Sequence, residues 1–353
     1  MVEKVLMKGN EAIAEAAIAA GCRHFFGYPI TPQTEVAAYM SKRMPKIGGV
    51  YLQAESEVAS INMVLGAGAA GVRVMTSTSS PGISLMSEGI SYIAGSDVPC
   101  LIVNVERGGP GLGGIQPSQS DYFQATKATG HGDFHMLVFA PSTVQETVDL
   151  ISDAFDLGDK YRMPTMILSD GLLGQMMEPV VLPEHKEPTD NKDWAAKGHQ
   201  GKRAHNVVNS LYIDPKELED LNFKRFEKYK HIMETEQRAE EYLVDDADII
   251  IVAFGASSRI SHSAVDMARK QGIKAGLIRP ITLWPFPEKF IRKHVGDAKA
   301  FLSVEMNMGQ MVEDVKLTVK DEKPVHFFGR TGGMVPTPKE VLEQIIKING
   351  GEC

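Results

Sequence analysis

The sequence predicts an α/β protein with two parallel sheets, each covered by helices. Short apolar segments alternate regularly with helical patterns, and the apolar segments are nearly continuous, as in strands buried on both faces. The alternation stops near residue 178 and resumes near residue 246, which indicates two units. With 353 residues, 43% of them hydrophobic, the chain is large enough to fill two cores.

The first unit is expected over residues 1–180. Its predicted strands cover 23–28, 49–53, 72–78, 98–106, 135–140 and 164–170, and its predicted helices cover 11–20, 32–44, 56–70, 83–95 and 143–158. Asn10 is the expected cap of the first helix, and Gly21 its expected end.

The middle of the chain, residues 181–245, is predicted to be a connector. It begins with a polar, proline-bearing stretch and ends in a charged helical pattern over 214–243. Either it is a solvated connector with an exposed helix, or it is an arm that clasps another subunit.

The second unit is expected over residues 246–353. Its predicted strands cover 247–255, 273–279, 299–305 and 324–329, and its predicted helices cover 257–271, 286–296, 309–320 and 338–348. A domain of roughly 100 residues can hold its own core.

Charge and composition exclude several classes of protein. A formal net charge of −8 argues against a nucleic-acid surface, because phosphate binding relies on clustered Lys and Arg. Glu3, Lys4, Lys8 and Glu11 interrupt the first apolar stretch, so neither a signal peptide nor a membrane span is expected. We therefore expect a cytoplasmic protein.

The cysteines exclude a metal cluster held by this chain alone. Cys22, Cys100 and Cys353 lie far apart and form no C-x-x-C pair, so the chain cannot supply an iron–sulfur cluster or a four-thiolate zinc site. Any electrons must travel through another component.

A glycine-rich segment imitates a dinucleotide-binding motif. Gly109–Gly114 matches G-x-G-x-x-G, but it is not in the first βα unit and runs into "IQPSQSD", which cannot open a helix at once. We expect a flexible loop on the substrate side and no NAD binding.

Several residues could carry chemistry. Glu57 stands where a strand passes into a helix rich in small residues; favourable alignment with the helix dipole is its alternative explanation, and Glu55 is its rival. Arg107 follows a strand directly, at the edge where open α/β sheets bind ligands, and could hold a carboxylate through two hydrogen bonds or be an ordinary surface residue. Ser80, before Pro81, is a candidate helix cap.

The remaining motifs are weaker. His131, Asp133 and His135 alternate as metal ligands can in a strand, but we expect no metal there. Motifs of zinc proteases, α/β-hydrolases and P-loop enzymes are absent.

The turn "GYPITP" is the most unusual local feature. Pro29 and Pro32 bias the residues before them away from helical angles. The pattern predicts that Pro32 opens a helix with Thr31 as its cap, so that the helix start exposes backbone N–H groups and one hydroxyl.

Four motifs in order give a specific resemblance. "YPITP" (28–32), "ESE" opening the small-residue helix, "TSTSSPG" (76–82) and the Arg-Gly-Gly-Pro loop at 107–110 resemble the α subunit of 2-oxoacid:ferredoxin oxidoreductases, especially the branched-chain 2-oxoisovalerate type. "GLIRPITLWPFP" and "SVEMNMGQM" look like the family's second domain. The resemblance implies a pyrimidine-type thiamine diphosphate-binding fold followed by a smaller transketolase C-terminal-like domain.

The same resemblance implies roles for individual residues. Glu57 would hydrogen-bond N1′ of the thiamine pyrimidine, which favours the tautomer that deprotonates the thiazolium C2. Tyr28, Pro29 and Ile30 would line the cofactor together with Glu57. Arg107 would pair with the substrate's C1 carboxylate and Thr31 would hydrogen-bond near the substrate.

Partners follow from what the chain lacks. In the family, a β subunit holds the diphosphate, Mg²⁺ and a [4Fe-4S] cluster, and this chain has neither the Gly-Asp-Gly…Asn diphosphate motif nor cluster ligands. The resemblance therefore implies a hetero-oligomer with β, ferredoxin-like and γ-type subunits. It also implies coenzyme A and ferredoxin as reactants.

The predicted substrate rests on a sequence difference from related 2-oxoglutarate enzymes. Related 2-oxoglutarate enzymes tend to show Gly-Pro-Ser-Thr-Gly after the arginine, whereas Gly109-Pro110-Gly111-Leu112-Gly113 stands here. With no further Lys or Arg before Lys127, an apolar 2-oxoacid is favoured, with 3-methyl-2-oxobutanoate first and 2-oxoglutarate as the alternative. A non-catalytic assembly subunit is a third possibility.

Overall fold

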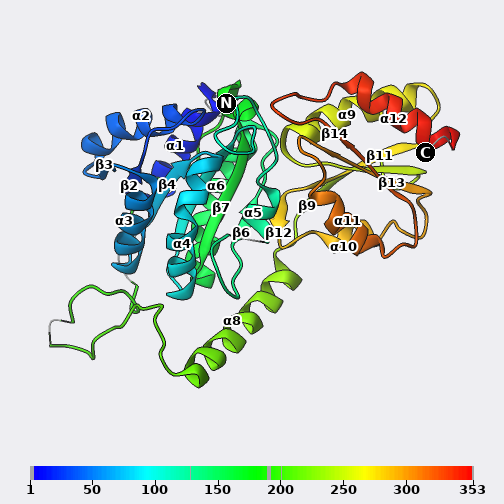
Figure 1. Ribbon diagram of the computed structural model, residues 1–353. Helices are drawn as coiled ribbons and strands as arrows, with labels where there is room; N and C mark the ends of the chain where they lie inside the picture. Colours follow the sequence, from blue (N-terminus) through cyan, green and yellow to red (C-terminus); the bar gives the residue numbers. More distant parts are fainter. Residues whose placement is uncertain (1–3, 128, 189–191, 200, 352–353) are drawn as a thin grey trace.

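The computed structural model describes residues 4–127, 129–188, 192–199 and 201–351. Two α/β units lie next to each other, and a loop-rich connector and a long helix run between them (Figure 1). Cys353 is outside the described residues.

The larger sheet has seven strands in the order β12-β6-β7-β5-β4-β2-β3. They are β2 (His24–Gly27), β3 (Val50–Gln53), β4 (Val74–Thr78), β5 (Cys100–Glu106), β6 (Leu137–Phe139), β7 (Pro164–Asp170) and β12 (Thr282–Trp284). All neighbouring strands are parallel except β12 and β6. The predicted parallel sheet is confirmed, with one antiparallel edge strand that comes from the second half of the chain.

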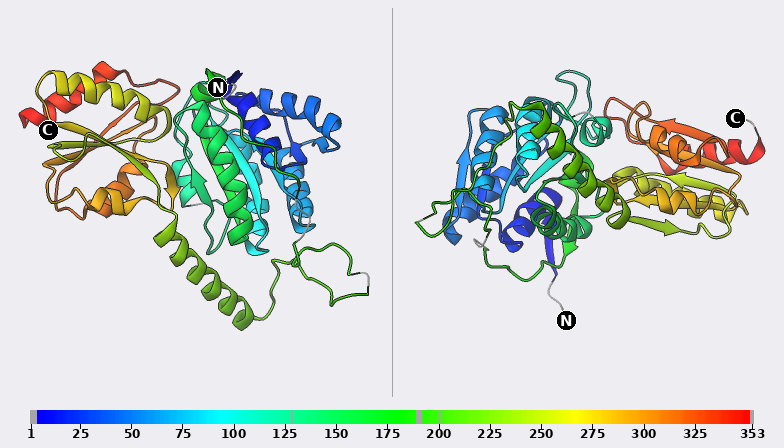
Figure 2. Two further views of the ribbon diagram at one scale, coloured as in Figure 1. Left: turned by 180° about the vertical axis from the view of Figure 1, so that it is seen from behind. Right: turned by 90° about the horizontal axis from the view of Figure 1, so that it is seen from below.

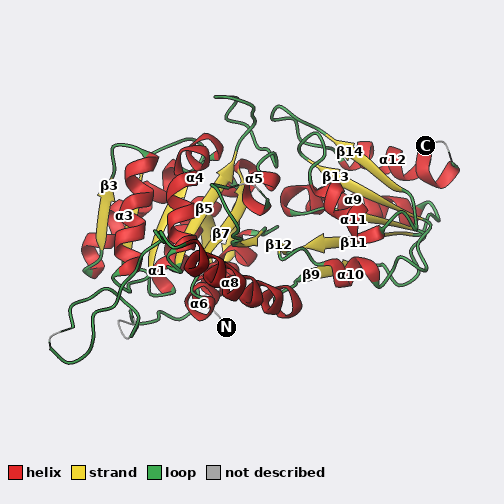
Figure 3. Ribbon diagram, turned by 60° about the horizontal axis from the view of Figure 1, so that its bottom comes forward, coloured by secondary structure: helices red, strands yellow, loops and turns green. Residues whose placement is uncertain are grey.

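Helices cover both faces of this sheet. They are α1 (Gly9–Ala19), α2 (Thr34–Arg43), η1 (Met44–Ile47), α3 (Glu57–Ala69), α4 (Ser80–Gly95), α5 (Tyr122–Thr126), α6 (Val144–Tyr161) and α7 (Gly171–Gln175). Figure 3 shows α3 and α4 on one face and α1 and α6 on the other. Every residue of β4, β5 and β7 is buried, as their continuous apolar character predicts. Beside the sheet, β1 (Val5–Lys8) and β8 (Met177–Val180) form an antiparallel pair.

The smaller sheet has five strands in the order β14-β13-β10-β11-β9. They are β9 (Ala239–Tyr242), β10 (Ile249–Val252), β11 (Ala275–Pro280), β13 (Ala300–Glu305) and β14 (Val325–Gly329). Its helices are α9 (Gly255–Lys270), α10 (Glu288–Arg292), α11 (Met311–Val319) and α12 (Pro338–Gly350). α9 and α12 lie on one side of the sheet, and α10 and α11 on the other (Figures 1 and 2).

The long helix α8 (Pro215–Thr235) is shorter than the predicted helix over 214–243. The segment after it becomes β9, which pairs antiparallel with β11 at the edge of the smaller sheet. There Glu240 forms an ion pair with Arg279 at 2.7 Å, a contact that a continuing helix could not reach.

Two helix starts differ from the prediction. α1 begins at Gly9, so Asn10 is not its cap; the Asn10 amide instead donates to the Pro32 carbonyl at 2.7 Å and to Glu35 at 2.8 Å. α4 begins at Ser80, which makes Ser79 the cap position and leaves the Ser80 hydroxyl for another contact. In both cases the polar side chain that was expected to cap the helix instead forms hydrogen bonds with a residue distant in the sequence.

Candidate functional site

The predicted site residues gather at one edge of the larger sheet. Tyr28 follows β2, Glu57 follows β3, Ser80 follows β4 and Arg107 follows β5. Because parallel strands end at the same edge, this is where an open α/β sheet binds ligands.

Arg107 and Thr31 are brought together. Arg107 is 7% exposed, and its guanidinium donates to the Thr31 carbonyl at 3.0 Å and to the Leu112 carbonyl at 3.1 Å. Its buried Nε has no acceptor among the described residues. The arginine thus links two loops and retains one N–H donor without an acceptor, as expected of a residue that also binds an anionic ligand.

The turn before α2 is not the predicted helix start. α2 begins at Thr34, the cap position is Gln33, and the Gln33 N–H bonds to the Ile30 carbonyl at 3.1 Å. The carbonyls of Thr31 and Pro32 accept instead from the Arg107 guanidinium and the Asn10 amide. The predicted helix start at Pro32 with Thr31 as its cap is therefore wrong.

The residues around this turn are tied to the sheet through Gln33. Its side-chain amide donates to the Tyr28 carbonyl at 3.3 Å and accepts from the Ser77 hydroxyl of β4 at 2.6 Å. Tyr28 and Thr31 are exposed, and Pro29 and Ile30 are half-buried. Within the described ranges no hydrogen bond occupies the Thr31 hydroxyl.

Glu57 is the first residue of α3, whose cap is the Ser56 hydroxyl. Its side chain lies against α4: a Cβ on Gly82 would stand 2.9 Å from Glu57 Oε1, so only glycine leaves this space. Glu57 is 5% exposed whereas Glu55 is exposed. Its carboxylate has no hydrogen bond or ion pair with the described residues, and its oxygens, which are not among the fully buried polar atoms that lack a partner, are open to another molecule.

The surroundings of Glu57 suit a polar ring. The hydroxyls of Thr76, Thr78 and Ser79, at the end of β4, are buried and have no partner in the described part of the chain. A carboxylate and several hydroxyls with unused hydrogen-bonding capacity match an aminopyrimidine, which carries both donors and acceptors.

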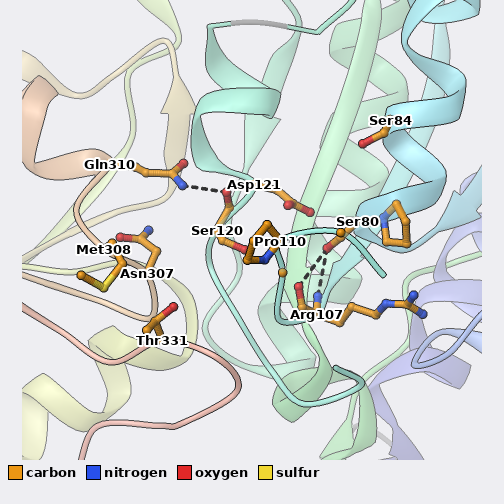
Figure 4. Close-up of a pocket in the computed structure, with 13 residues that line it drawn as sticks. Ser80, Ser84, Arg107, Pro110, Ser120, Asp121, Asn307, Met308, Gln310 and Thr331 are labelled. Carbon is orange, nitrogen blue, oxygen red and sulfur yellow. Dashed lines mark hydrogen bonds between the residues drawn. The ribbon is translucent and has the colours of Figure 1, made fainter. Parts of the chain in front are cut away.

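Ser80 connects the two halves of the site. Its hydroxyl accepts from the Arg107 N–H at 3.0 Å and donates to the Arg107 carbonyl at 3.2 Å (Figure 4). The sequence suggested a cap here because a serine before a proline is a common helix start. Nothing in the neighbouring sequence indicates the contact of Ser80 with Arg107, which is 27 positions away.

A cleft opens between the two units beside Arg107. Its volume is about 360 Å³, and its lining includes Ser80, Arg107 and Asp121 from the first unit and Asn307 and Gln310 from the second. In Figure 4 the Gln310 side chain reaches across to Ser120, whose carbonyl accepts from its amide at 2.7 Å.

Three buried acids at the cleft were not predicted from the sequence. Glu106 accepts from the Asp121 N–H at 2.8 Å and is the register partner of Asp170 on β7. Burial raises the pKa of Glu106 well above its usual range, and the Asp121 and Asp170 carboxylates raise it further. Burial also raises the pKa of Asp121 and that of Asp170.

The three residues of the His-Asp-His motif do not converge. His131 and Asp133 are exposed, while His135 stacks on Trp284 with ring centroids 4.5 Å apart. In the ranges that the structure describes, no group of three His, Cys, Asp or Glu residues could hold a metal ion.

The glycine-rich segment forms a tight loop. A Cβ on Gly113 would meet the Gly108 carbonyl oxygen at 1.8 Å, and the next helix starts only at Tyr122. No helix N-terminus follows the glycines, as a dinucleotide site requires.

Comparison with known families and proteins gives a consistent result. Residues 15–244 match the thiamine diphosphate-binding family of pyruvate flavodoxin/ferredoxin oxidoreductases, and residues 247–341 match core domain II of pyruvate:ferredoxin oxidoreductases. The ketoisovalerate oxidoreductase subunit VorB of Methanothermobacter thermautotrophicus is 49% identical over 346 residues, which cover 98% of each chain. The 2-oxoglutarate synthase subunit KorA of the same organism is 37% identical, over 99% of this chain and 100% of the relative.

Solved structures agree on the fold. The 2-oxoglutarate:ferredoxin oxidoreductase of Magnetococcus marinus, with 2-oxoglutarate, coenzyme A and succinyl-CoA bound, superposes with a TM-score of 0.86 at 29% identity. The match covers 98% of this chain and 65% of that one. A split-gene transketolase, at 14% identity and a TM-score of 0.61, shares the fold. Among the described residues no helix is long and apolar enough to cross a membrane.

Proposed function

Since this chain belongs to the thiamine diphosphate-dependent 2-oxoacid:ferredoxin oxidoreductases, we propose that it carries the pyrimidine side of the cofactor site and acts on 3-methyl-2-oxobutanoate. With its partners it converts the 2-oxoacid, coenzyme A and oxidised ferredoxin into acyl-CoA, CO₂ and reduced ferredoxin. The observation that carries this proposal is the buried Glu57 carboxylate, which has no donor among the described residues.

Glu57 is proposed to accept a hydrogen bond from the cofactor's pyrimidine ring at N1′. Thiamine diphosphate, when bound, supplies the carbon nucleophile and the electron sink for decarboxylation. Gly82 leaves room for the Glu57 carboxylate beside α4, and the Thr78 hydroxyl lies next to it. Tyr28, Pro29 and Ile30 are proposed to close this side of the site.

Arg107 is proposed to hold the C1 carboxylate of the substrate. Its free Nε–H supports this role, and its two bonds to backbone carbonyls fix the guanidinium before substrate arrives. Thr31 stands next to it with an exposed hydroxyl that could reach the 2-oxo oxygen.

The loop after Arg107 supports an apolar substrate. Residues 108–120 contain no charged side chain, and Leu112, whose carbonyl is bonded to Arg107, is 81% exposed. The higher identity to the VorB subunits than to the KorA subunits points the same way. 2-Oxoglutarate is the second candidate, because the KorA relatives also match nearly the whole chain.

The relatives are named as subunits, so the chain works in a multi-subunit enzyme. The outer face of α3 supports a partner at the cofactor site: from Val58 to Val72 the sequence has no charge, although Val58 is 45% exposed and Gly66 and Ala70 are exposed. We propose that a β subunit covers this face and brings the diphosphate site, Mg²⁺ and a [4Fe-4S] cluster. Ferredoxin-like and γ-type subunits would complete the complex.

The test uses the complete complex. Acyl-CoA formation is measured with an artificial electron acceptor and with 3-methyl-2-oxobutanoate, 2-oxoglutarate or pyruvate. We expect the highest kcat/KM for 3-methyl-2-oxobutanoate. Preference for 2-oxoglutarate would overturn the substrate proposal, and no turnover of any of the three would favour a non-catalytic assembly subunit.

A further inference from the structure

Asp121 is a carboxylate fixed at the wall of the cleft between the two units. It is 9% exposed and lines the cavity beside Ser80. Its N–H donates to Glu106 at 2.8 Å, and one of its carboxylate oxygens accepts from the Asn104 amide at 2.8 Å. Its side chain also lies beside the Ser80 hydroxyl, which lowers its pKa in part. These contacts hold the carboxylate in one position.

The cleft adjoins the proposed cofactor site. Ser80 and Gly82 lie within the first turn of α4: Ser80 faces the cleft and contacts Asp121, whereas Gly82 lies against the Glu57 carboxylate. Arg107, the proposed partner of the substrate carboxylate, also lines the cleft, so a molecule in the cleft lies next to the substrate site.

Asp121 is the residue of this lining that can take up a proton. Among the described residues that line the cavity, the only other titratable group is Arg107, which stays protonated in proteins. The rest of the lining consists of hydroxyl, amide, methionine, glycine and proline side chains.

Burial makes Asp121 a better base than an exposed carboxylate. Glu106 packs below it, Asp170 lies beside Glu106, and Arg259 lies near Asp170 but is bound to Glu178 at 2.8 Å. Burial raises the pKa of Asp121, which favours proton uptake, although Ser80 and Asn104 lower it in part. The Asp121 carboxylate in turn raises the pKa of Glu106.

We propose that Asp121 accepts the proton of the thiol substrate during acyl transfer. The S–H bond breaks, the sulfur forms a bond to the acyl carbon, and the acyl group leaves its carrier, which keeps the electron pair. The proton goes to the Asp121 carboxylate. This inference rests on the proposed function, in which the thiol is coenzyme A.

The first test separates the thiol step from the steps before it. In the complete complex, CO₂ release is measured with an artificial acceptor and no thiol, and acyl-CoA formation is measured with thiol. Asp121→Asn is expected to slow thiol-dependent turnover by about 10²-fold or more and to leave thiol-free CO₂ release within about twofold. Equal losses in both assays, or an unchanged thiol-dependent rate, would overturn the role.

The second test uses a hydrogen-bond donor to Asp121. Asn104→Ala removes the amide that donates to the Asp121 carboxylate and lowers its pKa. We expect the acidic limb of the thiol-dependent pH profile to move to higher pH, because Asp121 then holds its proton more tightly. The exposed Asp133→Asn is the matched control and should move nothing. An acidic limb that stays in place in Asn104→Ala would contradict the proposal.

A readout without turnover completes the test. Infrared difference spectra of the cofactor-free complex, wild type against Asp121→Asn, should show a carboxyl group that titrates at higher pH than an exposed carboxylate and moves to still higher pH in Asn104→Ala. Absence of that signal would overturn the inference even if the complex turns over 2-oxoacids. A complex that turns over none of them would overturn the proposed function instead.

Discussion

Arg107 and Glu57 stand at the same edge of one sheet, but their surroundings differ. The Arg107 guanidinium is bonded to two carbonyls of its own chain, and its backbone is bonded to Ser80. Glu57 is buried as deeply, yet its carboxylate has no partner among the described residues. The chain thus builds the substrate side of the site by itself and leaves the cofactor side for another molecule to complete.

Glu57→Gln should give the largest effect. Loss of the carboxylate removes the hydrogen bond that activates the cofactor, so kcat of the complex should fall by about 10²-fold or more. The unfolding free energy of the isolated chain should change by less than about 0.5 kcal/mol, because the carboxylate makes no hydrogen bond or ion pair with the described residues. Steady-state kinetics and denaturant unfolding check both; normal turnover would leave the assembly subunit as the better account.

Arg107→Lys should lower both the activity of the complex and the stability of the isolated chain. Lysine cannot reach both carbonyls and the substrate carboxylate with one planar group, so kcat/KM should fall about ten- to hundredfold. The isolated chain should also lose about 1–3 kcal/mol of stability, because the carbonyls of Thr31 and Leu112 lose their donor. A stability unchanged by this substitution would show that the two loops are not held by Arg107.

Val58→Lys tests whether the outer face of α3 is covered. The isolated chain should keep its stability within about 0.5 kcal/mol, since the side chain is partly exposed. Affinity for the partner subunit, measured by calorimetry, should fall at least about tenfold, because a charge would be buried. Val207→Lys, at an exposed position of the connector, is the control. Equal affinity of both variants would place the partner elsewhere.

Glu106→Gln should give the smallest effect, visible as a change in the pH dependence of stability. The folded-state pKa of Glu106 is raised, so its contribution to stability is present at acid pH and is lost as pH rises above the unfolded-state pKa. The variant should therefore gain stability over the wild type between about pH 5 and pH 7 and none near pH 4. Thermal unfolding across this range checks the sign, and a gain confined to acid pH would contradict it.

The sequence predicted the parallel strands of both sheets and the loops that carry the site, because continuous apolar segments and their spacing are local properties. It missed the antiparallel strands β1, β8, β9 and β12; the partner of β12, for example, lies 143 or more residues earlier in the chain. It misassigned Asn10, Thr31 and Ser80 as helix caps for a related reason. Each of them meets a residue 22 to 76 positions away, where rules about neighbouring residues give no information.

The buried acids could not be predicted at all. Glu106 and Asp170 are the last residues of two apolar strands, and only the register of β5 with β7 places them side by side. Asp121 reaches them through a loop whose path depends on the second unit, where Asn307 donates to the Gln119 carbonyl at 2.7 Å. Glu57, in contrast, was chosen over Glu55 by family resemblance, and the two differ in burial accordingly.

The central claim is that this chain supplies only the pyrimidine side of the cofactor site. Its most direct test is thiamine diphosphate binding, measured by calorimetry with Mg²⁺ for the isolated chain and for the complex with its partner subunit. The account predicts weak binding to the isolated chain and tight binding to the complex. Micromolar binding to the isolated chain would contradict it.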